Sequence, residues 1–254
     1  MKSKKLIVAN WKMNPASLAE ARVLFGKTKK AGGRLDSVET IICPPFPYLG
    51  ILAHAGTTRV RLGAQDSYFL NGGRATGEVS PEMLRDLGVS YVIVGHSERR
   101  ALGETNEVVA KKIKAVLAER LSPIVCIGEK ERDSEGKYFD VLKSQISASL
   151  AEVSRPQLRY IVIAYEPLWA IGKSARDAAD PRMIQEVVIF IRKVLADAFG
   201  EEAAQAPDII YGGATEASNT ASILTEGGVS GLLVGHKSLD VEEFMSMVKI
   251  ANDC

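Results

Sequence analysis

The sequence predicts an α/β fold in which eight parallel strands, each followed by a helix, close into a single (β/α)8 barrel. Short apolar runs recur along the 254 residues, with helical patterns or loops between them and no linker-like segment. The runs are continuously apolar rather than alternating, which is typical of strands buried on both faces in a parallel sheet covered by helices. We therefore expect one domain that spans residues 1–254.

Eight apolar runs are the expected strands. They are KLIVA from Lys5, ETIIC from Glu39, VRLGA from Val60, YVIVG from Tyr91, PIVCIG from Pro123, YIVIAY from Tyr160, DIIYGG from Asp208 and GLLVG from Gly231. A doubly wound open sheet is the competing fold, but no GxGxxG sequence follows the first run.

Two of the intervening segments carry clear helix signals. After residue 179, Asp180 can cap a helix, Pro181 suits its first position and Gly200 can end it. The expected apolar stripe of this helix is Met183, Val187, Ile191, Leu195 and Ala198.

A second helix is expected after Thr105, which is a candidate cap. Its apolar side would consist of Val109, Ile113, Val116 and Leu117, which follow at helical spacing.

Composition excludes several classes of protein. The 32 Lys and Arg residues nearly cancel the 31 Asp and Glu residues, so no global field points to nucleic acid or a membrane. The apolar run after the basic start is too short for a signal peptide, and no stretch approaches the roughly 20 apolar residues of a membrane helix. Cys43, Cys126 and Cys254 are an odd number of cysteines without metal-type spacing, and the first two lie in strand-like apolar runs, as buried thiols do. This pattern favours a reducing, cytoplasmic location.

In a barrel of this kind, chemistry takes place at the carboxyl ends of the strands. The residues that follow the expected strands there are Asn10, Trp11, Lys12, His96, Ser97, Glu98, Glu166, Pro167, Gly212, Gly213, Gly235 and His236. A lysine, a histidine and a glutamate from three different strands thus converge on one face, which indicates acid-base chemistry.

Six motifs in this order resemble the triosephosphate isomerase family, whose fold is the TIM barrel. They are ANWKMN from Ala9, TGEVSP from Thr76, VGHSERR from Val94, CIGE from Cys126, AYEPLWAIG from Ala164 and YGG from Tyr211. The resemblance implies an aldose-ketose isomerase of glycolysis and gluconeogenesis that interconverts dihydroxyacetone phosphate and D-glyceraldehyde 3-phosphate without a metal or organic cofactor.

The resemblance also implies catalytic roles. Glu166 matches the base, and His96 matches a neutral imidazole electrophile whose pKa is held down by a helix that Ser97 could cap; the family is itself a well-known example of such tuned acid-base chemistry. Lys12 would supply positive charge, and Asn10 would orient Lys12 and contact substrate. Glu98 and Arg100 are expected to support the histidine, and Cys126 to be a packed strand residue.

The expected lid after the sixth strand departs from the family pattern. PLW from Pro167 matches its first hinge, but Gly172 runs straight into KSARDAADP. Either Lys173, Ser174 and Ala175 form the second hinge of a shortened tip, or the RDAAD segment from Arg176 is extra loop.

Two further departures fall on the expected phosphate site, which would include Gly172. Ala214 stands where the family usually has Ser, and Gly235 is followed by His236 where the family usually has Gly-Gly. Backbone N–H groups survive both changes, so we expect Ala214, Gly235 and His236 still to contact the phosphate.

The segment Asn71–Pro81 resembles the loop through which family members pair, with Thr76 at its tip. It implies a homodimer, the alternative being a mobile Gly-rich surface loop.

Two rival functions remain open at this point. An isomerase of a related sugar phosphate, such as a tetrulose phosphate, would keep Lys12, His96 and Glu166, and comparing specificity constants would separate it from a triose enzyme. A non-catalytic paralogue that only binds a phosphorylated ligand is the second rival, and an isomerase assay would identify it.

Overall fold

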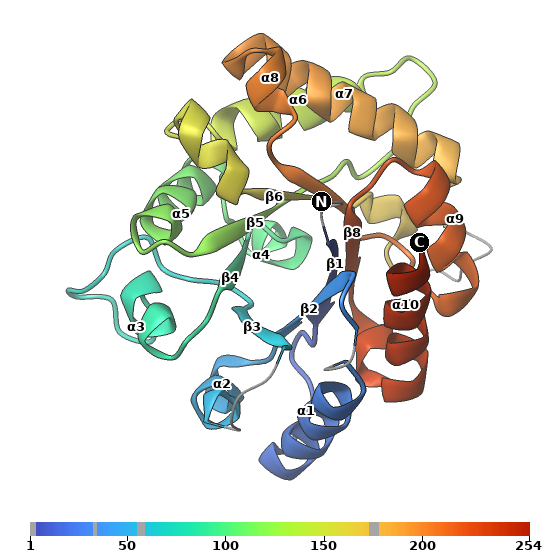
Figure 1. Cartoon of the computed structure of the whole chain (residues 1–254). Helices are drawn as coiled ribbons and strands as arrows, with labels where there is room; N and C mark the ends of the chain where they lie inside the picture. The colour runs from blue at the N-terminus through green and yellow to red at the C-terminus, as the bar shows by residue number, and fades with distance from the viewer. Residues whose placement is uncertain (1–3, 33–34, 55–58, 173–177) are drawn as a thin grey trace.

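The computed structural model describes residues 4–32, 35–54, 59–172 and 178–254, and it contains a closed parallel barrel (Figure 1). Its strands are β1 (Lys5–Asn10), β2 (Val38–Cys43), β3 (Arg61–Ala64), β4 (Tyr91–Val94), β5 (Ser122–Ile127), β6 (Val162–Tyr165), β7 (Asp208–Tyr211) and β8 (Gly231–Val234). Each strand pairs with the next in parallel, and β1 also pairs with β8, which closes the barrel.

Helices form the outer ring. They are α1 (Leu18–Gly32), α2 (Phe46–Ala53), α3 (Pro81–Asp86), α4 (Ser97–Ala101), α5 (Asn106–Ala118), α6 (Tyr138–Ser149), α7 (Pro181–Phe199), α8 (Glu201–Ala204), α9 (Ala217–Glu226) and α10 (Val241–Asp253). Short 3-10 segments lie between them at η1 (Arg155–Tyr160), η2 (Leu168–Ala170) and η4 (His236–Leu239). Figure 1 shows α10 beside α1, so the last helix packs next to the first.

The predicted barrel is confirmed, and the doubly wound alternative is excluded because the sheet closes on itself. All the expected strands form, with small shifts at their ends. Tyr160 belongs to η1 rather than to β6, and Val60 precedes β3.

The signals for α7 are confirmed at both ends, but its buried face is rotated from the expected one. The Asp180 side chain accepts a hydrogen bond from the Arg182 N–H (2.8 Å), and Gly200 ends the helix at a φ of 90°. Ala198 is exposed and Met183 only partly buried. The buried residues are Ile184, Val187, Val188, Ile191, Val194 and Leu195.

Thr105 caps α5 as predicted, because its side chain accepts a hydrogen bond from the Val108 N–H (3.4 Å). Val109, Ile113 and Val116 are buried, and Leu117 is partly buried.

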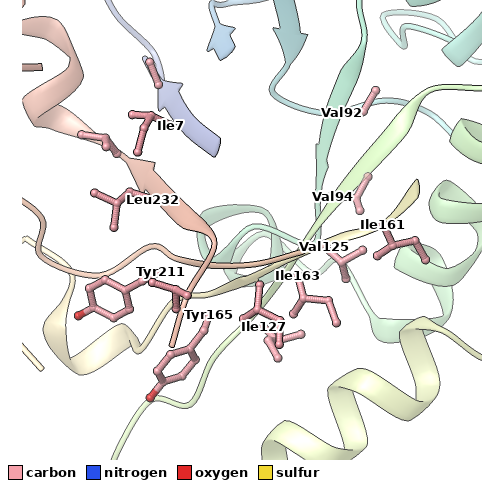
Figure 2. Packing of buried hydrophobic residues seen from close by; sticks show 14 of the residues in the cluster. Ile7, Val92, Val94, Val125, Ile127, Ile161, Ile163, Tyr165, Tyr211 and Leu232 are labelled. Atoms are coloured by element: carbon pink, nitrogen blue, oxygen red, sulfur yellow. The ribbon is translucent and has the colours of Figure 1, made fainter. Parts of the chain in front are cut away.

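Alternate residues of each strand face two separate apolar layers. One layer fills the barrel and is built from residues such as Val8, Ile124 and Ala164. The other lies between the strands and the helices, and Figure 2 shows part of it with Val125 and Ile163 close together. Burial of both strand faces explains why the sequence runs are continuously apolar.

Within the described ranges, no helix combines the length and the apolarity that crossing a membrane requires.

The two isoleucines of α7 offer a matched test of its buried face. Ile191→Ala should lower the free energy of unfolding by about 2–5 kcal/mol, because it empties a packed position. Ile189→Ala should change it by no more than about 0.5 kcal/mol, since that side chain is 63% exposed. Urea unfolding followed by circular dichroism measures both, and equal midpoints for the two variants would contradict the burial of Ile191 on the packed face of α7.

Candidate active site

A cavity of about 290 Å³ opens at the carboxyl ends of the strands. Every residue that the sequence nominated for catalysis or substrate binding lines it: Asn10, Lys12, His96, Glu166, Gly172, Ala214, Gly235 and His236. They come from the ends of β1, β4, β6, β7 and β8 and from the loops that follow. Closure of the barrel therefore brings together residues that are far apart in the sequence.

Lys12 is held in an uncommon backbone conformation. Its φ is 54°, in the left-handed region that residues with a side chain rarely adopt. Its N–H donates to Asn10 Oδ1 (3.0 Å), and Gln65 Nε2 donates to its carbonyl (2.8 Å). The same Gln65 group also donates to the Cys43 carbonyl (2.9 Å), so the turn after β1 is tied to the end of β2. Asn10 orients Lys12, as expected.

The Lys12 ammonium points toward α4 and pairs with Glu98. Nζ lies 2.5 Å from Glu98 Oε1, and the lysine side chain is 26% exposed. Glu98 is thus ion-paired as expected, but with Lys12 rather than with the histidine. Because Glu98 is more than half exposed, the pair is well solvated and can rearrange at little cost.

His96 caps the short helix α4 with its own ring, whereas Ser97 had been expected to cap it. The Glu98 N–H donates to His96 Nδ1 (3.2 Å), and Ser97 is the first helical residue. A ring nitrogen that accepts a hydrogen bond carries no proton, so the neutral ring holds its proton on Nε2. The helix amide therefore directs an N–H donor into the cavity.

Glu166 is buried against His96, with Oε1 3.2 Å from Nε2 of the ring. Its backbone N–H donates to the Ile127 carbonyl (2.7 Å), which continues the sheet beyond β6. Two glycines make room for it: a Cβ at Gly128 would lie 1.9 Å from the Glu166 carbonyl oxygen, and one at Gly212 would lie 2.7 Å from Glu166 Cγ. The second of the YGG glycines after β7, Gly213, lies against the ring of Tyr211.

The two buried groups shift each other's pKa. Burial alone raises the pKa of Glu166, but the His96 ring, the Cys126 thiol and Lys12 lower it by more, so the net pKa is lowered. Burial likewise lowers the pKa of His96, but Glu166 and Glu98 raise it by more. The pKa of His96 is therefore raised while the Glu166 carboxylate lies against the ring, in the direction opposite to the one that the resemblance implies.

Cys126 and Arg100 complete the support behind Glu166. Cys126 is fully buried, and burial raises the pKa of its thiol, so it is a packed strand residue as predicted. Arg100 Nε donates to the Gly95 carbonyl (2.7 Å) and a second guanidinium nitrogen donates to the Cys126 carbonyl (3.3 Å). Arg100 thus ties the end of β4 to the end of β5.

The start of the loop after β6 is anchored on Glu129. Its Oε1 accepts hydrogen bonds from the Tyr165 hydroxyl (2.9 Å) and from Trp169 Nε1 (2.8 Å), and its carbonyl accepts one from the Leu168 N–H (2.9 Å). The alternatives for the second hinge involve Lys173, Ser174 and Ala175 or the segment from Arg176, and residues 173–177 lie outside the described ranges.

The other end of the cavity has fewer fixed side chains. Ala214 is buried and apolar, and Gly235 precedes the exposed His236 at the start of η4. Lys237 Nζ lies 3.1 Å from Glu216 Oε1.

Over the described part of the chain, no three His, Cys, Asp or Glu residues form a group that could hold a metal ion.

Comparison with known proteins assigns the family. The family model described as triosephosphate isomerase matches residues 5–251. A triosephosphate isomerase of Dehalococcoides mccartyi is 43% identical over 248 residues, which cover 97% of this chain and 96% of the relative. That of Carboxydothermus hydrogenoformans is 42% identical over 252 residues (97% and 98%), and that of Rhodopirellula baltica 41% over 254 residues (99% of each).

The chain belongs to the triosephosphate isomerase family.

The resemblance carried by the six motifs is thus confirmed, and with it the assignment as an isomerase. Sequence reasoning gave no role to two residues of this triosephosphate isomerase site, Gln65 and Glu129. Gln65 directly follows β3 at the catalytic edge, and Glu129 ends the CIGE motif after β5. Their position after a strand was a usable signal, but the two carbonyls that Gln65 binds and the two aromatic side chains that Glu129 binds become visible only in three dimensions.

Gly212 provides a test of how tightly the Glu166 side chain is placed. Gly212→Ala should lower turnover about tenfold to a hundredfold, because its Cβ would displace Glu166 and small misplacements of a catalytic group are costly. Gly26→Ala is the matched control, since a Cβ there has no neighbour within 4 Å. Steady-state kinetics and circular dichroism measure turnover and folding, and native turnover in folded Gly212→Ala would show that the close contact is harmless.

Proposed function

We propose that this chain interconverts dihydroxyacetone phosphate and D-glyceraldehyde 3-phosphate through an enediol(ate), with Glu166 as the base, His96 as the electrophile and Lys12 as the fixed positive charge. The observation that carries the proposal is the geometry of the catalytic pair. A buried carboxylate lies 3.2 Å from the nitrogen of an imidazole, in a cavity also lined by Lys12.

Glu166 suits the role of base in two respects. Its lowered pKa keeps the carboxylate ionised at neutral pH. Its Oε2 is buried and accepts no N–H or O–H hydrogen bond within the described ranges, so this oxygen is free to take a proton. A positioned carboxylate of this kind accelerates proton transfer by about 10²–10⁴-fold.

In the proposed reaction, Glu166 removes a proton from the carbon next to the substrate carbonyl. The electrons of the broken C–H bond form a carbon-carbon double bond, and negative charge develops on the carbonyl oxygen. The Nε2–H of His96 donates to that oxygen, and Lys12 stabilises its charge. His96 gives its Nε2 proton to that oxygen and takes the hydroxyl proton of the neighbouring oxygen, which becomes the new carbonyl. The proton on Glu166 then returns to the former carbonyl carbon, and the enzyme is left unchanged.

The proposed reaction requires the substrate to lie in the cavity in one orientation. Its two oxygen-bearing carbons would lie between Glu166 and His96, replacing the contact between these side chains. Its phosphate would lie at the opposite end, beside Gly172, Ala214, Gly235 and His236. The anchoring of Trp169 on Glu129 places the loop after β6 next to Glu166, where its closure would exclude water from the enediolate.

Glu166→Gln should lower kcat by about 10²–10⁴-fold, because the amide cannot accept the proton. Binding of a substrate analogue should stay close to that of the unchanged protein. Glu202→Gln, at an exposed glutamate of α8, is the control and should keep full activity. A coupled assay with each triose phosphate and calorimetry with the analogue measure the two effects, and an equal loss of binding and turnover would count against Glu166 as the base.

The proposal includes a homodimer formed through the loop around Thr76. The base of this loop is closed by a hydrogen bond from the Tyr68 N–H to the Val79 carbonyl (2.8 Å), and Asn71 Nδ2 donates to Glu119 Oε1 (2.6 Å). Thr76 is exposed, and Figure 1 shows the segment between β3 and α3 extending away from the barrel.

Large apolar side chains are exposed immediately before and after this loop in the sequence. Met13, Leu102, Met83 and Leu70 are 93%, 80%, 54% and 50% exposed. Leu70 directly precedes the loop and Met83 follows it in α3, whereas Met13 follows β1 and Leu102 follows α4. Exposed apolar groups of this size favour association.

Thr76→Arg should shift the protein from dimer to monomer at micromolar concentration, because the exposed tip would carry a bulky charge into the partner. Ile189→Arg replaces an exposed side chain of α7, which lies away from the segment between β3 and α3 (Figure 1), and should leave the dimer intact. Sedimentation velocity measures both, and a monomeric unchanged protein would refute the dimer.

Two buried cysteines support a cytoplasmic location. Cys43 and Cys126 are free thiols inside the barrel, as a reducing compartment would leave them.

A further inference from the structure

His236 is a side chain of the cavity that the proposed reaction does not require. It follows Gly235 at the end of β8, is exposed, and lines the cavity. Its imidazole makes no ion pair or hydrogen bond with any residue in the part of the chain that the structure describes.

The backbone before His236 lies close to the Lys12 ammonium. A Cβ built on Gly235 would lie 3.4 Å from Lys12 Cε and 3.9 Å from Lys12 Nζ. The pairing of β8 with β1 fixes this neighbourhood, because Val234 lies opposite Ala9 in the register. An anion bound beside Gly235 therefore lies within reach of both Lys12 and the residue that follows Gly235.

Ala214, Thr215 and Lys237 line this end of the cavity together with His236. Ala214 contributes only a methyl group, and Lys237 is paired with Glu216 at 3.1 Å. Among the basic side chains at this end, His236 is the one that has no carboxylate partner in the described part of the chain.

The charged and titratable groups that face this end come from several elements. They are Lys12, His96, Glu98, Glu166, Glu216 and Lys237. Each of the three carboxylates already has a basic neighbour within 3.2 Å: Lys12, His96 or Lys237. Among these groups, no carboxylate is left to pair with the His236 ring in place of a bound anion.

We propose that the His236 imidazole is an additional ligand of the substrate phosphate and that it binds this group more tightly at acid pH than at alkaline pH. The identity of the ligand, a phosphate monoester, rests on the proposed function. A histidine ring gains a charge between pH 8 and pH 5, and a charged N–H donor binds phosphate oxygens more strongly than a neutral one. His236 would thus tune substrate affinity without entering the proton transfer.

The test compares the unchanged protein with His236→Gln between pH 6 and pH 8.5. At pH 6 the variant should have a KM for dihydroxyacetone phosphate about threefold to tenfold higher, and the two KM values should converge toward pH 8.5. The substrate phosphate titrates in the same way whichever protein is present. The ratio of the two KM values therefore reports the contribution of His236 alone. His54→Gln, at the exposed end of α2, is the matched control and should follow the unchanged protein.

A KM ratio that stays constant across this pH range would overturn the proposal. Calorimetry with inorganic phosphate tests it without turnover, and the dissociation constants should show the same ratio at pH 6. Equal dissociation constants of the two proteins at pH 6 would also overturn it. If the unchanged protein does not isomerise triose phosphates, the proposed function fails, and the phosphate titration still decides the role of His236.

Discussion

The pairing of β1 with β8 is the constraint on which the rest of the structure depends. It joins the first and last strands of the chain and converts a sheet with two edges into a closed barrel. The contact is close: a Cβ at Gly231 would lie 1.9 Å from the Leu6 carbonyl oxygen, so β8 can start there only with glycine. Without this closure, Lys12 and Gly235 would not be neighbours, and the cavity would lack one wall.

Closure of the barrel alone does not orient the proposed catalytic groups. Hydrogen bonds from polar residues at the strand ends hold them in position. The left-handed backbone of Lys12 costs about 1–3 kcal/mol, and hydrogen bonds with Asn10 and Gln65 hold it in place. On the opposite side, Arg100 bonds to carbonyls of two strand ends. The α4 amide that donates to His96 fixes the ring's tautomer. Backbone geometry and catalytic function are thus linked through a few hydrogen bonds at each strand end.

The sequence allowed the strands and the cavity residues to be predicted because both follow from simple patterns. Continuous apolar runs mark strands buried on two faces, and the rule that barrel chemistry lies at carboxyl ends selected residues such as Lys12 and Glu166. Other features depend on tertiary contacts. The buried side of α7 is set by what it packs against, so the stripe that included Ala198 was placed wrongly. The capping role of His96 required knowing that its ring turns back toward α4.

The two ends of the cavity differ in the groups on which they depend: buried side chains at one end and backbone N–H groups at the other. This difference accounts for where the chain departs from the pattern of its family. At the proposed catalytic end, Glu166 and His96 are buried and shift each other's pKa, and Glu166 also fills space left by Gly128 and Gly212, so a change of either side chain alters several interactions at once. At the end where we propose that the phosphate binds, backbone N–H groups are available whatever the side chain is. Ala214 and His236 can therefore stand there in place of the family's Ser and Gly without loss of those amides. Variation is tolerated where recognition depends on the backbone, and a side chain such as His236 can then add an interaction of its own.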